Sequence, residues 1–407
     1  MGRVDGEPAL EAGRLGRTPV GFIAGLAICC VAALIALAVV VLRGPAPTLI
    51  SLGLAVLPVP LLIAGVLYID RLEPEPRGLL LLVFAAGAAA AALMLLAGAL
   101  GADLPTSPPL GPRSAGQAAP ALGAVLAGAV VAESLKGAVL LGLLRFRRWE
   151  LDGAHDGVVY ASMAGLGFAL VGNLHAYLAA EAGGAGALAN AFLLRGVASP
   201  LWDPLFSSLI GIGVAYAAMR RGARGLWAVA TGWAAAVALR AMWDDSAGGG
   251  AGRTPVVYAI LVAAIAVVVG AVVMDRRRIV ALIVAFLPAY ESAMVVTGRD
   301  VVMLGSMRWR RLARHWARLH RGLAGMRAMA IYQLAATELA LACNRADRDL
   351  MEPAAFATRC EQSLAMMRGA TAFFRDRRPE PPQPPWARMG ESAFGPPQPK
   401  RRQKAAT

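Results

Sequence analysis

Five ionisable residues lie inside stretches that are otherwise apolar enough to cross a membrane. Glu133 and Lys136 occur in "VVAESLKGAVLL", His175 in "GFALVGNLHAYL", Asp203 in "RGVASPLWDPLFSSLIGIG" and Arg240 in "WAAAVALRAMWDD". A charged side chain in hydrocarbon is costly unless it has a partner, and such residues usually line an internal site or pathway. We therefore expect these five side chains to pair with one another or to form a site inside the membrane.

Charge arithmetic indicates which residues pair. Glu133 and Lys136 are three residues apart, so they share a helical face and can pair locally. Arg240 needs an acid, which predicts an internal ion pair with Asp203 or with Glu133. These residues would then form a buried ion-pair cluster of Glu133, Asp203 and Arg240 that clamps the spans together. A proton or substrate path and a metal or hydrolytic site are the alternatives, although a chain with four His offers few metal ligands.

The elements that must position these residues are membrane-spanning helices. Of the 407 residues, 57% are hydrophobic and only 16% are charged, which is outside the range of soluble proteins. About 20 apolar residues are needed to cross the hydrocarbon core. Runs of this length predict eight spans, at 20–42, 48–69, 78–100, 119–144, 156–180, 188–219, 225–243 and 254–274. The predicted fold is an all-α polytopic membrane protein.

Arginine is distributed unequally between the connecting loops. Loops 70–78, 145–157, 220–225 and 275–278 are rich in Arg, whereas the loops between them hold few. The positive-inside rule places the Arg-rich loops in the cytoplasm, together with both termini. The first span is long and has no small-residue cleavage motif, which is typical of an anchor rather than a removable signal. We expect a multi-pass protein of the plasma membrane.

Four regions follow from this pattern along the chain. They are a cytoplasmic leader (1–19), a transmembrane domain (20–274), a basic cytoplasmic helical domain (275–374) and a disordered Pro-rich basic tail (375–407). Segment 279–304 is apolar, but Pro288 and Glu291 interrupt it, and a ninth crossing would carry the Arg-rich segment 308–327 outside. We expect a packed or interfacial cytoplasmic helix there, and the sequence leaves open which of the two.

The net charge of +14 is concentrated in residues 275–407, which hold 23 Arg or Lys against 11 Asp or Glu. A basic region joined to a membrane domain is expected to rest on anionic lipid rather than to bind nucleic acid. Cysteine is sparse. Cys29 and Cys30 are adjacent in the first span, and Cys343 and Cys360 lie in the basic domain, so no disulfide framework is indicated.

Several motifs together resemble a known family. "AESLKG" (132–137), "DGVVYASMAGLGFALVGN" (156–173), "RGVASPLWDPLFSSLIGIG" (195–213) and "ALRAMWDD" (238–245) have the order and spacing of the PrsW family of intramembrane proteases, in its actinobacterial form. The resemblance covers about 20–375. It implies a PrsW-like membrane fold and a metal-dependent protease that cleaves single-span membrane proteins, such as the anti-sigma factors of signalling pathways.

The resemblance also shows where this chain departs from the family. The family carries a Glu-Glu-x-x-Lys motif, a Phe-x-x-x-Glu-Asn motif and two later His residues that supply metal ligands and the general base. Glu133 is the only retained catalytic candidate, with Lys136 beside it. Four family positions are substituted, namely Ala132, Gly172, Asp203 and Arg240.

These substitutions lead to two main hypotheses. A guanidinium cannot ligate a metal but pairs well with carboxylates, so Arg240 favours a metal-free, inactive relative that binds membrane-anchored, single-span partners. The alternative is an active zinc metalloprotease with the altered ligands Glu133, His175 and Asp203, because His175 shares a helical face with Gly172. A transporter is a third hypothesis, disfavoured because the sequence shows neither an inverted repeat nor paired broken spans.

Overall fold

The computed structural model describes residues 45–70, 75–99, 122–220, 222–246, 254–293 and 295–374. The predicted leader, the first span (20–42) and the tail (375–407) lie outside these residues. All regular elements in the described ranges are helical, and these ranges contain no strand. The all-α prediction is therefore confirmed.

Seven helical stretches in the described part of the chain are long and apolar enough to cross a membrane. They are Thr48–Ile69, Arg77–Ala99, Leu122–Phe146, Ala154–Glu181, Ala185–Ala218, Ala223–Ser246 and Pro255–Glu291. These stretches correspond to the second to eighth predicted spans. The chain is a polytopic membrane protein.

Some of these stretches are single helices and others are composite. The single helices are α5 (Arg77–Ala99), α6 (Leu122–Phe146), α7 (Ala154–Glu181) and α10 (Ala223–Ser246), with a short 3-10 turn, η1 (Arg148–Glu150), before α7. The first stretch combines α3 (Pro45–Val56) with α4 (Val59–Ile69). The fifth combines α8 (Ala185–Phe192), the π-helical η2 (Leu193–Ala198) and α9 (Trp202–Ala218).

Two spans are interrupted, although the sequence showed no paired broken spans. Residues 57–58 separate α3 from α4, and residues 199–201 separate η2 from α9. Proline explains both places, because Pro58 and Pro200 lack the amide hydrogen that continues a helix and restrict the residue before them. At the second interruption the Ser199 hydroxyl donates to the Leu194 carbonyl at 2.6 Å, which satisfies one backbone acceptor at the end of η2.

The last membrane helix is longer than predicted. Helix α11 runs without a break from Thr254 to Phe286 and is followed by the 3-10 segment η3 (Leu287–Ala293). Segment 279–304, expected to be one packed or interfacial helix, is instead divided among α11, η3 and α12 (Gly298–Leu304). The helix ends just before Pro288, as the restriction on residues that precede proline requires.

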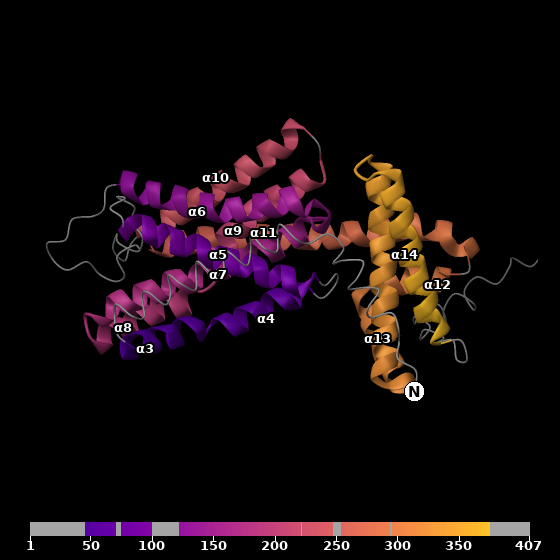
Figure 1. Ribbon diagram of the computed structural model, residues 1–407, viewed down its shortest axis with the longest axis horizontal. Coiled ribbons are helices and arrows are strands. Elements are labelled where there is room, and N and C mark those ends of the chain that lie inside the picture. The colour runs from indigo at the N-terminus through magenta and orange to yellow at the C-terminus, as the bar shows by residue number, and fades with distance from the viewer. Residues whose placement is uncertain are drawn as a thin grey trace, which may run out of the picture. The chain divides into compact units, whose positions relative to one another are not determined.

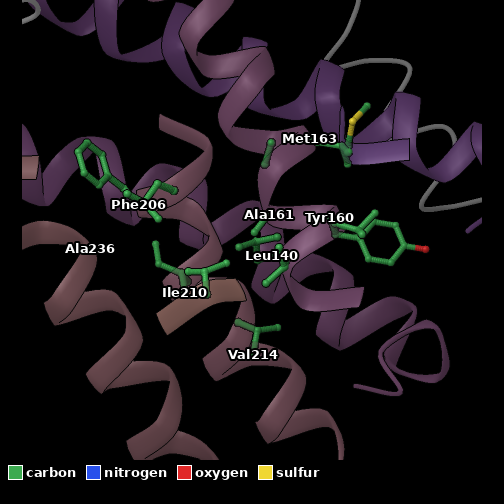
Figure 2. Packing of buried hydrophobic residues seen from close by; sticks show 14 of the residues in the cluster. Leu140, Tyr160, Ala161, Met163, Phe206, Ile210, Val214 and Ala236 are labelled. Carbon is green, nitrogen blue, oxygen red and sulfur yellow. The ribbon is translucent and has the colours of Figure 1, made fainter. Parts of the chain in front are cut away.

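Helix α7 is the centre of the membrane-spanning bundle and packs against α5 on one side and α9 on another, as the adjoining ribbons in Figure 1 show. Glycines make this close approach possible. A Cβ atom at Gly167 would collide with the Phe84 carbonyl oxygen of α5, and one at Gly157 would collide with the Gly211 carbonyl oxygen of α9. Around these contacts α6, α7, α9 and α10 interdigitate apolar side chains. Figure 2 shows Leu140, Tyr160, Ala161, Phe206, Ile210, Val214 and Ala236 in this cluster.

The described residues between Val280 and Phe374 form a second compact unit, which we call the helical unit. It contains α12, α13 (Met307–Asp347) and α14 (Pro353–Ala372), and α13 and α14 lie side by side (Figure 1). Helix α12 begins with a capping box in which the Thr297 amide donates to the Asp300 carboxylate at 2.9 Å. Helix α13 changes direction at Gly322, whose φ of 64° is readily adopted only by glycine.

Candidate functional site

Helices α6, α9 and α10 bring four charged side chains together inside the membrane-spanning bundle. On α6, Lys136 Nζ lies 2.7 Å from Glu133 Oε1, and it also donates to Asp203 Oδ1 of α9 at 3.1 Å. From α10, Arg240 Nη1 donates to the same Asp203 oxygen at 2.7 Å and to Glu133 Oε1 at 3.3 Å. Each carboxylate thus contacts both cations. We call these four residues the charge cluster.

The charge cluster is buried most deeply on α6 and less deeply on the other two helices. The side chains of Glu133 and Lys136 are fully buried, whereas those of Asp203 and Arg240 are 23% and 14% exposed. Burial of a charge is tolerated when the partner is close and hydrogen-bonded. The contacts of Lys136 with two carboxylates meet this condition.

The interruption of the fifth span positions Asp203. Because α9 begins at Trp202, Asp203 lies in the first helical turn, where the free amide groups of the helix favour a negative charge. Gly165 of α7 allows the backbone to come close, since a Cβ there would lie 2.7 Å from the Asp203 carbonyl oxygen. A continuous helix would not present Asp203 in this way.

An aromatic ring covers both cations of the charge cluster. The centroid of the Phe168 ring lies 5.0 Å from Lys136 Nζ and 5.5 Å from Arg240 Cζ. These distances are typical of cation–π contacts, which gain strength where water is excluded. Phe168 therefore stabilises the positive charge of both cations.

The network extends from the charge cluster to two further residues. Arg240 Nε lies 3.6 Å from Asp244 Oδ2, and Arg195 of η2 interacts electrostatically with Asp244 and Asp203. Together with the charge cluster this makes three acidic and three basic groups, so the network is neutral without a metal ion. Arg195 was not among the candidate residues of the sequence analysis, although its position inside the predicted span 188–219 was an available signal.

The residues present do not fit a zinc site. Nowhere in the described ranges do three or more His, Cys, Asp or Glu side chains come together to hold a metal ion, so Glu133, His175 and Asp203 do not form a ligand group. Lys136 and Arg240 instead occupy the space beside both carboxylates. At the other substituted family positions, Ala132 is buried and offers no ligand atom, and a Cβ at Gly172 would meet open space.

One oxygen in the charge cluster has no hydrogen-bond partner among the residues that the structure describes. Glu133 Oε2 is buried and accepts no hydrogen bond from these residues, although Glu133 Oε1 contacts both cations. A buried acceptor without a donor costs about 1–3 kcal/mol. The ion pairs of the cluster can hold α6, α9 and α10 together, but Glu133 Oε2 lacks a donor among the described residues.

A separate, partly buried acid, Glu75, lies just before α5, outside the membrane-spanning stretches. The Tyr160 hydroxyl donates to Glu75 Oε2 at 2.6 Å, and the Glu75 amide donates to Asp70 Oδ2 at 3.1 Å. Burial, and after it the negative charge of Asp156, raises the pKa of Glu75 well above its usual value. This carboxyl group therefore retains its proton to a higher pH than an exposed Glu.

Comparison with known proteins identifies the membrane-spanning region. Residues 75–273 match the model of the PrsW family of intramembrane metalloproteases. The matched segment includes the whole charge cluster as well as Ala132, Gly172 and His175. No curated protein matches the chain, and no solved structure matches it.

Proposed function

Because residues 75–273 belong to the PrsW family of intramembrane metalloproteases, we propose that this membrane protein is a protease-inactive member that binds membrane-anchored partner proteins. The observation that carries the proposal is the bridging of Glu133 and Asp203 by Lys136 and Arg240. Arg240, which the resemblance places at a metal-ligating His position of the family, instead forms ion pairs with both carboxylates.

The electrostatics of the charge cluster oppose metal binding. Arg240 carries a permanent charge and no lone pair for a metal, and it lies 2.7 Å from Asp203 Oδ1. A divalent cation next to this guanidinium would be repelled strongly in a low-dielectric environment. Water activation by a bound metal therefore has no support in this set of side chains.

Support for a partner within the membrane comes from the incomplete cover of the charge cluster. Asp203 and Arg240 keep 23% and 14% of their side-chain surface exposed. Charged surface that faces hydrocarbon is unfavourable. A polar residue on the single span of a partner would lower that cost by contacting the cluster next to the interruption that precedes α9.

The zinc content of the purified, detergent-solubilised protein tests the loss of the metal site. We expect far less than one ion per chain. An Arg240→His variant tests whether this one cation excludes the metal, with Arg224→His, at the exposed start of α10, as the matched control. About one zinc ion per chain in the native protein, removable by a chelator, would contradict the proposal. It would then favour a protease with altered ligands.

A photoreactive amino acid tests partner binding. Leu201 is 48% exposed beside the charge cluster, whereas Trp227, 70% exposed, lies at the other end of α10. We expect cross-linking in cells to join a single-span protein to position 201 and not to position 227. The product should be lost in an Arg240→Gln background. Equal yields at both positions would argue against a partner at this site.

We also propose a plasma-membrane location, with both termini in the cytoplasm and the helical unit resting on anionic lipid rather than nucleic acid. The first part of α13 supports this proposal. Arg308, Arg311 and Arg318 are exposed on one helical face. Interspersed on that face are Leu312 and Leu319, which are 37% and 70% exposed. A face that combines basic and apolar residues is typical of helices that lie on an anionic membrane surface.

A further inference from the structure

Two thiol groups and one phenol meet inside the helical unit. The Tyr290 hydroxyl of η3 lies 3.4 Å from Cys343 Sγ of α13 and 3.6 Å from Cys360 Sγ of α14. The two sulfur atoms therefore cannot be farther apart than the total of these two lengths. We propose that Cys343 and Cys360 are a site of reversible oxidation, in which a hydroperoxide converts them to an intramolecular disulfide.

The pairing follows from the way α13 and α14 fold against each other. The helices are connected by residues 348–352, so residues at similar distances from this turn lie opposite each other. Cys343 precedes the turn and Cys360 follows it, so the two lie within a few helical turns of the connection. Glu338 and Arg359 form an ion pair of 3.9 Å across the same interface. This ion pair and the contacts of Tyr290 with both cysteines thus place this part of α14 near this part of α13.

The two cysteines differ in the way that a stepwise oxidation requires. Cys343 is buried and Cys360 is partly exposed, so Cys360 is the thiol that meets the peroxide first. Its thiolate attacks one peroxide oxygen, breaks the O–O bond and forms a sulfenic acid with release of hydroxide. The sulfur of Cys343 then attacks the sulfenic sulfur and displaces a second hydroxide. The two thiol protons neutralise both hydroxides, so two thiols and one hydrogen peroxide give one disulfide and two water molecules.

Tyr290 acts as a positioning residue in this scheme. Burial raises the pKa of the Cys343 thiol, and the hydrogen bond between Cys343 and the Tyr290 hydroxyl opposes that effect, because the hydroxyl can donate to the thiolate. In the disulfide neither sulfur retains an S–H group, so the contacts of Tyr290 with the thiols change. Because Tyr290 belongs to η3, which directly continues α11, oxidation would alter the segment that follows the last membrane helix.

The test uses the full-length protein in detergent with Cys29→Ser and Cys30→Ser, so that Cys343 and Cys360 are the only thiols. After treatment with hydrogen peroxide we expect loss of both maleimide-reactive thiols, a linked pair of peptides in mass spectra, and recovery of both thiols with dithiothreitol. The matched control adds Cys360→Ser and should yield no linked pair. Thiols that remain reduced, disulfides between chains, or oxidation of Cys360 alone to a sulfinic acid would each overturn the proposal.

Tyr290→Phe separates positioning from simple packing, because it keeps the ring and removes only the hydroxyl group. We expect this variant to form the same disulfide, with the pH dependence of the second step, the attack of Cys343 on the Cys360 sulfenic acid, shifted to higher pH. A shift of this kind would not follow from a purely structural role. An unchanged pH profile would contradict the assignment of Tyr290 as a positioning residue.

Discussion

At the scale of single residues, the charge cluster combines partners that the sequence suggested with a geometry that it could not define. The need for an acid beside Arg240 followed from charge arithmetic alone. That Lys136 and Arg240 each contact both carboxylates depends on how α6, α9 and α10 rotate relative to one another. Such rotation is decided by packing between helices distant in the chain. It has no local signal in the sequence.

Removal of one cation should therefore destabilise the fold. Arg240→Met leaves Asp203 and Glu133 with Lys136 as their only basic partner in the charge cluster, and breaking a buried ion pair costs about 3–5 kcal/mol. We expect a loss of about 3 kcal/mol in the free energy of unfolding, measured by denaturant titration in detergent. Arg224→Met, at the exposed start of the same helix, is the control and should change stability by less than about 0.5 kcal/mol. Equal effects of the two changes would contradict a stabilising cluster.

Glu75 predicts a pH dependence of stability. Its pKa is raised in the folded state, chiefly by burial, so the folded protein holds this proton more tightly than the unfolded chain does. The resulting contribution is fully present below the usual pKa of 4.5 and is lost as pH rises through the folded pKa. Glu75→Gln mimics the protonated group. The melting temperature of this variant should exceed that of the native protein at neutral pH, and the two should converge near the usual pKa. Glu361→Gln, at an exposed site, is the control and should leave the pH profile of the melting temperature unchanged.

At the scale of elements, hydropathy predicted where spans occur but not how they are built. The interruption before α9 needs only Pro200 in an apolar run, yet proline is also tolerated in continuous membrane helices when neighbours satisfy the freed backbone groups. Hydropathy averaged over a whole span hides this difference. The extension of α11 past Arg278 was missed for the opposite reason, because a run of arginines was taken as the end of a helix that in fact continues.

Replacing two glycines of α7 by alanine should change the stability of the protein in opposite directions. Gly167→Ala forces a Cβ into the Phe84 carbonyl of α5, whereas a Cβ at Gly172 meets open space. Alanine is the better helix former by about 1 kcal/mol, so Gly172→Ala should raise the free energy of unfolding. Gly167→Ala should lower it by about 1–3 kcal/mol because overpacking displaces α5. Denaturation of both variants in one detergent checks this contrast, and a gain at both positions would show that α5 does not approach α7 so closely.

The basic face of α13 gives a prediction about lipid. Replacement of Arg308, Arg311 and Arg318 by Gln removes three exposed charges and no buried contact. Each basic residue near an anionic surface contributes about 1 kcal/mol. In nanodiscs with anionic lipid, α13 of the native protein should exchange amide hydrogens more slowly than in zwitterionic nanodiscs, and more so at low salt. The triple variant should lose this dependence, and a native protein that shows none would count against lipid contact.

At the scale of the whole molecule, composition sufficed for the fold class. A chain that is 57% hydrophobic, with apolar runs of span length, has no stable arrangement in water, and helices are the simplest way to satisfy its backbone in lipid. The all-α polytopic fold was predictable for this reason. The motifs were enough to indicate the family, which the match over residues 75–273 supports. The sidedness of the termini is still a prediction.

A reporter fused after Thr407 tests that sidedness. Seven described candidate spans and the predicted first span would together put both ends on one side, and the arginine distribution predicts that this side is the cytoplasm. A reporter active only in the cytoplasm should therefore work at the C-terminus, and one active only outside should not. Fusions in the 101–121 connection should give the reverse pattern. The same result at both sites would contradict the predicted topology.

The pairing of charges also has a consequence for the biosynthesis of the protein. Lys136 and Glu133 lie on one helix, so α6 can leave the translocon as a locally neutral segment. Asp203 and Arg240 belong to α9 and α10, which are consecutive in the chain, and can be released into the bilayer together as a hairpin. An unpaired charge at a helix centre costs about 2.5–3.5 kcal/mol during insertion. Each pair joins residues on one helix or on two consecutive helices. The charge cluster therefore adds little to the free-energy cost of inserting this protein into the membrane.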